Sequence, residues 1–331
     1  RWYLPESGAW ALVLAMLGAL WMFLPRGVPA RGLGIVLFVP LLVPPRHLPT
    51  EGAFEAIFID VGQGLSVLVR THDHAMLYDA GARYPSEFDL GKSAVVPTLR
   101  TLGIGALDLL VVSHGDNDHA GGAASVLRAY PAIERIGGEP ARSEIELAPC
   151  IAGRSWNWDG VRFATLSPLA DVSADVSESS DNDHSCVVLV EGRAGRLLLT
   201  GDISQHVEPA IAAQIDPDAA PLVLGVPHHG SRSSSGADFI ATLRPVLAVV
   251  SAGWRSRFGH PHADVVARYG RADVPLLDTA HAGAVRVTFP ADSPPHAEAE
   301  RQRSRHYWRE DRAPDASSGA PVAESRPVPL L

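Results

Sequence analysis

The sequence predicts a layered α/β domain of two sheets packed face to face, with helices outside, preceded by two apolar segments. Short apolar runs separated by turn residues follow residue 50, which indicates closely spaced strands. Later apolar runs alternate with helical stretches. A chain that is first rich in strands and then alternates suits two packed sheets better than a single parallel sheet.

The first fifty residues are predicted to form a transmembrane helical hairpin. Ser7–Leu24 carries no charge, has Trp10 and Trp21 near its two ends, and is about long enough to cross a bilayer as a helix. Gly32–Val43 is shorter, so a short spanning helix, a re-entrant piece and an interfacial segment all fit it. A second apolar run argues against a cleaved signal peptide.

Composition limits the class of protein. The formal net charge of −9 argues against a generally basic protein that coats nucleic acid, although a local basic groove is compatible with it. The only cysteines, Cys150 and Cys186, have no metal-ligand spacing. A disulfide scaffold is excluded, and a single bridge fits if the domain faces an oxidising compartment. The sequence leaves open whether they pair.

The expected elements follow in chain order. Apolar runs at Phe54–Asp60, Leu65–Arg70 and Ala75–Tyr78 predict an antiparallel meander. Residues 51–295 form the predicted domain, and residues 296–331 a disordered tail, since apolar periodicity is lost from Arg301 onward. Further strands are expected at Leu107–Val112, Val161–Leu166, Cys186–Val190, Leu197–Thr200, Leu222–Val226, Val246–Val250 and Val285–Phe289. Helices are expected at Ser93–Leu102, Gly121–Ala129, Ile203–Ala213, Gly236–Leu243 and His262–Tyr269.

The segment Ser113–His119, which reads SHGDNDH, is the most informative in the chain. It places two imidazoles and two carboxylates in one loop after the apolar run Leu109–Val112. Gathering charged groups at this density is costly unless a cation neutralises them. Metal binding is therefore the first hypothesis, and a solvated acidic turn is the alternative.

Other polar residues also follow apolar, strand-like runs. They are Asp79 after Tyr78, Asp202 after Leu197–Gly201, and the pair His228 and His229. In a layered α/β architecture the strand ends converge on one edge, so these side chains can meet the His/Asp loop. Asp79 alone would more readily be a turn residue.

The order of these motifs resembles the metallo-β-lactamase superfamily. Within it, the chain is similar to the C-terminal domain of the ComEC family, the competence channel for DNA uptake. The motifs that carry this resemblance are DVGQG at Asp60–Gly64, SHGDNDH at Ser113–His119, LTGD at Leu199–Asp202, VPHHGS at Val226–Ser231 and GHPH at Gly259–His262. The resemblance implies a four-layer αβ/βα fold and a two-metal hydrolytic site.

The resemblance also implies a role for each site residue. His114 and Asp116 would bind one ion, Asp118 and His119 the other, Asp202 would bridge them, and His228 would complete the second site. Asp79 would orient the loop, and either Asp183 or His184 would be the third ligand of the first site. Ser231, His260 and His229 would contact substrate phosphate or transfer protons, and the residues expected in catalysis are Asp118, Asp202 and His229.

Asp116 stands where many relatives carry His, so the site is richer in carboxylate. Carboxylates favour two Mn²⁺ or Mg²⁺ ions over Zn²⁺, although Zn²⁺ still fits. The implied function is a metal-dependent nuclease that cleaves phosphodiester bonds. Its implied partners are DNA, single-stranded or as incoming duplex, the membrane, the remainder of the channel and other competence proteins.

The implied location is the inner membrane of a bacterium. The sequence leaves open on which side the soluble domain lies, and a periplasmic side would suit contact with incoming duplex DNA. Two other functions fit the sequence. One is a non-catalytic domain that binds or guides DNA, and the other is a hydrolase of small esters, lactones or β-lactams with the same fold.

Overall fold

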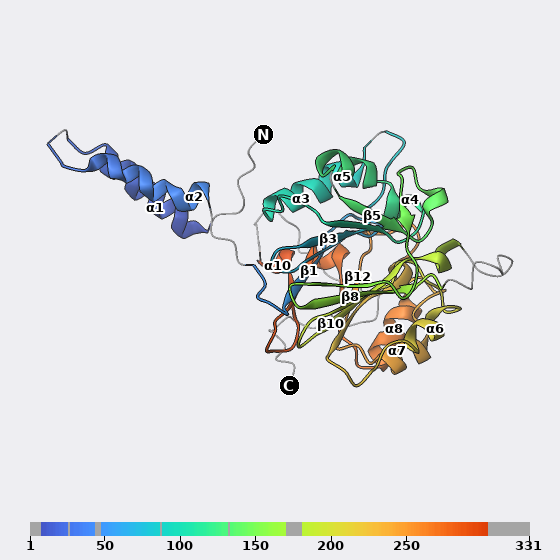
Figure 1. Ribbon diagram of the computed structural model, residues 1–331. Coiled ribbons are helices and arrows are strands. Elements are labelled where there is room, and N and C mark those ends of the chain that lie inside the picture. Colours follow the sequence, from blue (N-terminus) through green and yellow to red (C-terminus); the bar gives the residue numbers. More distant parts are fainter. Residues whose placement is uncertain are drawn as a thin grey trace. The chain divides into compact units, whose positions relative to one another are not determined.

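The computed structural model describes residues 8–25, 27–43, 48–86, 88–131, 133–169 and 181–303. The chain divides into two compact units. The first contains residues 1–48 and 97–105, and the second contains residues 49–96 and 106–331 (Figure 1).

The first unit contains a helical hairpin. It consists of α1 (Ala9–Met22), the 3₁₀ helix η1 (Arg31–Phe38) and α2 (Val39–Leu42). A Cβ atom added to Gly18 would lie 2.4 Å from the carbonyl oxygen of Gly34, so α1 and η1 approach closely because both positions are glycine. Among the described residues, no helix combines the length and the apolar character needed to cross a membrane.

The described part of the second unit forms two mixed sheets. The first sheet has eight strands in the order β15 (His296–Ala299), β14 (Val285–Phe289), β1 (Phe54–Phe58), β2 (Val67–Arg70), β3 (Ala75–Tyr78), β4 (Leu109–Val112), β5 (Glu134–Gly137) and β6 (Ala148–Pro149). The second has seven strands in the order β13 (Leu276–Asp278), β12 (Leu247–Val250), β11 (Leu222–Gly225), β10 (Arg196–Leu199), β9 (Val187–Glu191), β8 (Val161–Ser167) and β7 (Ser155–Trp158).

Strand direction places the candidate residues on one edge. β3, β4, β5 and β6 run parallel, and so do β10, β11, β12 and β13. The remaining neighbours are antiparallel. The carboxyl ends of β3 and β4 therefore lie at one edge of the first sheet, and those of β10 and β11 at one edge of the second.

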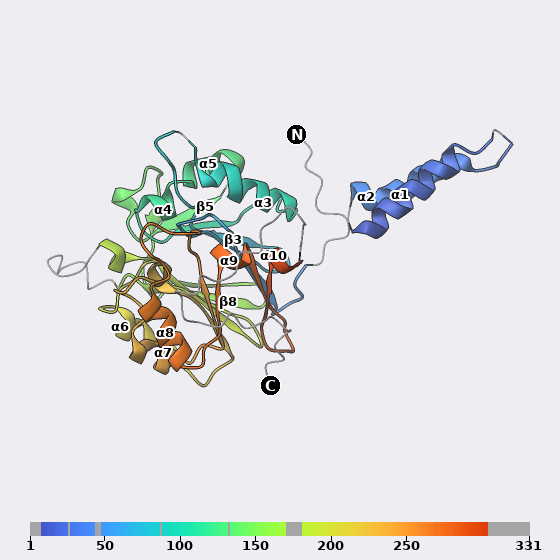
Figure 2. The ribbon, with the colours of Figure 1, turned by 180° about the vertical axis from the view of Figure 1, so that it is seen from behind.

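The two sheets enclose the main core. In β9, Val188 and Val190 face this core, while Val187 and Leu189 face the helices outside the second sheet. All four side chains are buried because β9 is covered on both faces, which explains its continuous apolar run. In Figures 1 and 2 the sheets lie in the middle, with α5 on one side and α6, α7 and α8 on the other.

The helices complete the layers. The helices of the second unit are the π-helix η2 (Gly91–Val95), α4 (Asn117–Ala120), α5 (Ala123–Ala129), α6 (Glu208–Ala212), α7 (Ala237–Leu243), α8 (Ala263–Arg271), α9 (Thr279–Ala282) and α10 (Glu300–Arg303). α3 (Val96–Thr101) belongs to the first unit from Pro97 onward. Short 3₁₀ helices are η3 (Pro140–Arg142), η5 (Asp181–His184) and η6 (Pro227–Gly230).

Most predicted elements are present, with two corrections. The antiparallel meander is confirmed as β1, β2 and β3. The helix expected at Ile203–Ala213 begins only at Glu208. The predicted start of the disordered tail, residue 296, was placed too early. His296–Ala299 forms the edge strand β15, which pairs with β14, and α10 follows it. The residues beyond Arg303 lie outside the described part.

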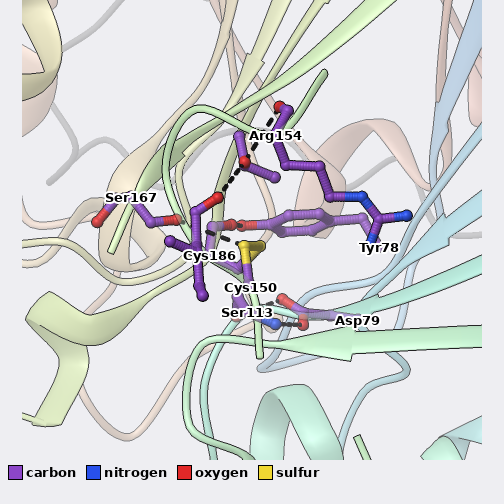
Figure 3. The surroundings of a disulfide bond; sticks show 9 residues. Tyr78, Asp79, Ser113, Cys150, Arg154, Ser167 and Cys186 are labelled. Carbon is purple, nitrogen blue, oxygen red and sulfur yellow. Dashed lines mark hydrogen bonds between the residues drawn. A yellow bond between two sulfur atoms is a disulfide. The ribbon is translucent and has the colours of Figure 1, made fainter. Parts of the chain in front are cut away.

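Cys150 and Cys186 form a disulfide, which the sequence had left open. It joins the residue after β6 in the first sheet to the residue before β9 in the second, and both cysteines are buried. The backbone of Cys186 is held on two sides, because its N–H donates to Ser113 O at 2.8 Å and its carbonyl accepts from Tyr78 Oη at 2.7 Å. Figure 3 shows the bridge beside Tyr78 and Ser113. The disulfide therefore links the two sheets.

Replacing both cysteines by alanine is expected to lower the free energy of unfolding by about 2–4 kcal/mol, because the bridge restricts the unfolded chain. Guanidinium denaturation of the full chain measures the change. Reductant should lower the midpoint of the wild type and leave that of the double variant unchanged. Equal unfolding free energies of wild type and variant would contradict a stabilising role.

Candidate metal centre

The candidate residues come from the ends of neighbouring strands. Asp79 follows β3, and the loop from Ser113 to His119 follows β4. Asp202 follows β10, and His228 and His229 follow β11. Because these strands end on the same side of the two sheets, the sequence-distant side chains meet.

Asp79 organises the loop after β4. Its Oδ1 accepts from the N–H of Ser113 at 2.6 Å, and its Oδ2 accepts from Ser113 Oγ at 2.8 Å (Figure 3). The same Oδ2 accepts from His119 Nδ1 at 2.8 Å. Asp79 has a φ of 60°, a left-handed conformation that Asp tolerates better than most residues. Asp79 thus occupies the place expected of a residue that orients the loop.

Three imidazoles present Nε2 to the site. His119 has its Nδ1 on Asp79, and His229 donates its Nδ1 to Ser251 O at 2.8 Å. The two Nε2 atoms consequently face each other at 3.1 Å. His114 Nδ1 lies 3.0 Å from Ser113 Oγ, which leaves its Nε2 buried without a hydrogen-bond partner among the described residues. Metal-binding histidines are commonly held this way, with one ring nitrogen on an acceptor and the other on the ion.

Two carboxylates lie against these imidazoles. Asp202 Oδ1 is 3.1 Å from His119 Nε2, and Asp118 Oδ2 is 3.3 Å from His229 Nε2. Two groups of possible ligands result, one made of His114, His119 and Asp202 and the other of Asp118, His119 and His229. They share His119, whose Nε2 can bind one ion at a time, so the two groups are alternative ways in which these residues could hold a cation.

His228 is the predicted ligand of the second site, whereas the neighbouring His229 belongs to a group of possible ligands. His228 Nε2 lies 3.6 Å from Asp202 Oδ2 and 3.4 Å from Asn182 Nδ2, and its Nδ1 is near Ser233 Oγ. It belongs to neither ligand group. Both histidines have a φ of 52°, a left-handed conformation that costs about 1–3 kcal/mol per residue and turns the two rings to different surroundings.

Asp116, predicted as a ligand, contacts both His114 and Arg142. Its Oδ2 lies 3.6 Å from His114 Nε2, while its Oδ1 accepts from Arg142 at 2.9 Å. Its side chain is 39% exposed, and it belongs to neither ligand group. Arg142 also pairs with Glu139 and Asp181. Arg142 thus shares its charge among three carboxylates, and the distance of Asp116 from His114 leaves a cation contact open.

The remaining predicted residues surround the centre. Asp183 is buried and accepts from the N–H of Ser204 at 2.8 Å, so it holds the chain after Asp202 instead of joining a ligand group. Neither ligand group contains its neighbour His184. Ser231 Oγ is 3.1 Å from Ser233 Oγ. The ring centroid of His260 lies 6.3 Å from that of His229 and 6.0 Å from that of His228.

Asn182 beside His228 and Ser251 beneath His229 were not anticipated. Asn182 directly precedes the candidates Asp183 and His184, which was the available signal, whereas Ser251 follows β12 without a neighbouring motif. Only the folded chain identifies them.

Opposite charges compensate one another in the centre. Burial alone would lower the pKa of His119, but the carboxylates of Asp202 and Asp79 raise it well above its ordinary value. Burial would likewise lower the pKa of His229, and Asp202 and Asp118 raise it. Burial would raise the pKa values of Asp118 and Asp202, yet the neighbouring histidines lower both. The carboxylates thus carry negative charge that protonated imidazoles or bound cations can balance.

His260 differs from these two histidines. Burial, followed by the nearby His229 and His228, lowers its pKa to about 4. Its ring is therefore neutral near pH 7.

The residues present fit divalent cations. The buried His114 Nε2 and Asp202 Oδ1 both lack hydrogen-bond partners in the described part of the chain, and a cation would satisfy both. The two groups together offer imidazole from His114, His119 and His229, and carboxylate from Asp118 and Asp202. This set has three imidazoles, as the sequence predicted, but two carboxylates instead of three, and imidazole suits Zn²⁺ as well as other transition metals.

Comparisons with known proteins identify the family. The model of the metallo-β-lactamase superfamily matches residues 59–254, which contain both ligand groups. The chain belongs to the metallo-β-lactamase superfamily. The predicted fold of two packed mixed sheets with outer helices is thereby confirmed, while the membrane-spanning nature of the preceding hairpin stays a prediction.

Within the superfamily, the chain is similar to competence proteins. Recombination protein 2 of Haemophilus influenzae is 36% identical over 264 residues, covering 78% of this chain and 31% of that protein. Competence protein ComA of Neisseria gonorrhoeae is 34% identical over 276 residues, covering 83% and 38%. ComE operon protein 3 of Bacillus subtilis is 30% identical over 280 residues, covering 77% and 35%. The resemblance to the ComEC family is confirmed, and the chain spans about a third of the length of these relatives.

Asp79→Asn is expected to fold, because Asn also tolerates the left-handed conformation, and to bind divalent metal about 10- to 100-fold more weakly. Titration calorimetry with Mn²⁺ and Zn²⁺ measures the change. Asp159→Asn is the matched control, since Asp159 has a φ of 52° and accepts from Thr71, Asp73 and His74 outside the two ligand groups. Equal affinities of the two variants would refute the positioning role of Asp79.

His229→Ala should reduce metal affinity more than His228→Ala, because only His229 belongs to a ligand group. We expect at least about a tenfold difference between the two variants. Calorimetric titration of both proteins provides the test, and a larger loss in His228→Ala would restore the assignment made from the sequence.

Proposed function

We propose that this chain is the metal-dependent nuclease domain of a membrane DNA-uptake channel used in natural competence. It would cleave phosphodiester bonds of the strand that is not imported. The observation that carries the proposal is the pair of ligand groups that share His119 at the strand ends. The relatives named as competence proteins support the role in DNA uptake, and a hydrolase is the expected class of enzyme in this superfamily.

Bound divalent cations would supply Lewis-acid activation of water and neutralise charge on phosphate oxygens. The protein's own residues position this chemistry. His114, His119, His229, Asp118 and Asp202 would hold the cations, with Mn²⁺, Mg²⁺ and Zn²⁺ as candidates.

Side chains next to these ligands would act on the substrate and on protons. Asp79 fixes His119. Of the two candidate carboxylate ligands, Asp118 has a side chain that is 31% exposed and Asp202 one that is 6% exposed. Asp118 is therefore the better placed to exchange a proton with solvent.

The disulfide supports a periplasmic location. Cys150 and Cys186 are both buried and paired, and structural disulfides persist in oxidising compartments and are rare in the cytosol. A domain on that side of the inner membrane would meet incoming duplex DNA before one strand crosses.

Membrane attachment is proposed from the hairpin. Leu12, Met16 and Leu20 of α1 are more than half exposed, as expected of a surface that faces lipid or other apolar segments. The remainder of the channel polypeptide and other competence proteins are the proposed partners.

Cleavage of labelled single-stranded DNA by the full chain in detergent tests the nuclease proposal. Mn²⁺, Mg²⁺ and Zn²⁺ are compared, and EDTA should abolish cleavage. Asp202→Asn should cleave at least about 100-fold more slowly, because it removes the negative charge of the carboxylate in the group of His114, His119 and Asp202. Asp218→Asn is the matched control, as Asp218 is exposed and pairs with Arg244.

A folded, metal-loaded wild type that does not cleave would contradict the nuclease proposal. DNA binding without cleavage would favour the non-catalytic guide. Turnover of a chromogenic ester, lactone or β-lactam without DNA cleavage would favour the small-ester hydrolase.

A further inference from the structure

A series of rings leads from the surface to the metal centre. Phe258 is 54% exposed, and its ring lies 5.8 Å from that of His260 with an interplanar angle of 26°. His260 in turn lies 6.3 Å from His229, at an angle of 24°. The exposed Phe258 is thus separated by one ring from a residue of the candidate ligand set.

The loop that carries Phe258, residues 253–260, is held by Gln63. Gln63 Oε1 accepts from Ser256 Oγ at 2.8 Å and from the N–H of Gly253 at 3.4 Å. Its Nε2 lies 3.4 Å from His260 Nδ1. A Cβ at Gly253 would lie 2.8 Å from the backbone nitrogen of Gln63, so glycine allows this close approach. The DVGQG motif therefore holds the 253–260 loop through Gln63, while its Gly64 accepts from the hydroxyl of Ser251, whose carbonyl accepts from His229.

The loop is also basic. Arg257 lies over the ring of Phe258 at 4.7 Å, and Arg255 lies over the ring of Trp254 at 5.8 Å. Both arginines are exposed, and neither forms an ion pair with a carboxylate in the described part of the chain. Arg232, by contrast, is paired with Asp264 at 3.2 Å. Two cations and an exposed ring thus stand together beside the site.

We propose that the 253–260 loop binds single-stranded DNA, with Phe258 stacked on an unpaired base and Arg255 and Arg257 on the flanking phosphates. This inference rests on the proposed nuclease function and specifies its substrate as an unpaired strand. An exposed aromatic ring beside arginines is the usual platform for single-stranded nucleic acid, since every base has a π-face on which the ring can stack. In a duplex the faces of the bases are buried between neighbouring base pairs, so the ring selects an unpaired strand. The chain is acidic overall and would repel DNA over most of its surface. The positive charge of Arg255 and Arg257 would therefore direct the DNA phosphates to this loop.

Binding of a fluorescein-labelled oligothymidylate to the full chain in detergent with EDTA tests the inference without catalysis. Fluorescence anisotropy should show that Phe258→Ala lowers the affinity by about 5- to 100-fold. Phe258→Trp should restore it because tryptophan also stacks. An abasic oligonucleotide of equal length should bind Phe258→Ala and wild type alike, because it offers phosphates without bases.

Two further variants separate the parts of the loop. Arg255→Ala and Arg257→Ala should each reduce the slope of log affinity against log salt by about 0.7, the value for one phosphate contact on a single strand. The matched control for Phe258→Ala is Phe88→Ala, since Phe88 is 51% exposed and lies in another loop. Its affinity should equal that of the wild type.

Gln63→Ala should weaken binding without changing the salt slope, since it releases the loop and removes no charge. This loss should be smaller than that of Phe258→Ala.

Unchanged affinity of Phe258→Ala for the oligothymidylate would overturn the inference, as would an equal loss on the abasic strand. These outcomes are independent of the nuclease proposal, because EDTA removes the metal. A wild type that binds through Phe258 but never cleaves with metal would contradict the nuclease proposal and leave the stacking surface supported.

Discussion

The geometry of the candidate centre depends on the hydrogen bonds of Ser113. Its N–H and hydroxyl donate to Asp79, which ties the end of β4 to the end of β3. Its carbonyl accepts from the N–H of Cys186, which ties the first sheet to the start of β9 in the second. The disulfide of Cys186 strengthens the same junction. His114 hydrogen-bonds to Ser113, and His119 hydrogen-bonds to Asp79. The contacts between the two sheets therefore orient both rings, in addition to the loop itself.

Charge balance is the second requirement of the centre. Asp79, Asp118 and Asp202 approach the same imidazoles, and burial makes each uncompensated charge costly. Because the Nε2 atoms of His119 and His229 face each other at 3.1 Å, one of the two can carry the proton between them in the free protein, and a cation can replace that proton when metal binds.

Much of the site could be predicted because the relevant side chains follow apolar runs. Asp79, His119 and Asp202 stand directly after or near strand ends, and parallel neighbours bring such ends together. The choice between His228 and His229 could not be predicted, since the two are adjacent and both have left-handed backbone. Asp116 stays a predicted ligand, and its contact with Arg142, 26 residues away, could not be predicted from any local pattern. The link from Gln63 to His260 spans 197 residues, beyond any local pattern.

The sequence by itself determined the fold class, the strands that carry the site and the His/Asp loop, because these depend on local apolar patterns and on the spacing of short motifs. Only the tertiary structure decided which imidazoles face one another, that Cys150 and Cys186 pair, and that Phe258 stands in line with His260 and His229. These outcomes depend on the packing of one sheet against the other. Contacts of that kind join residues far apart in the chain, and no local pattern encodes them.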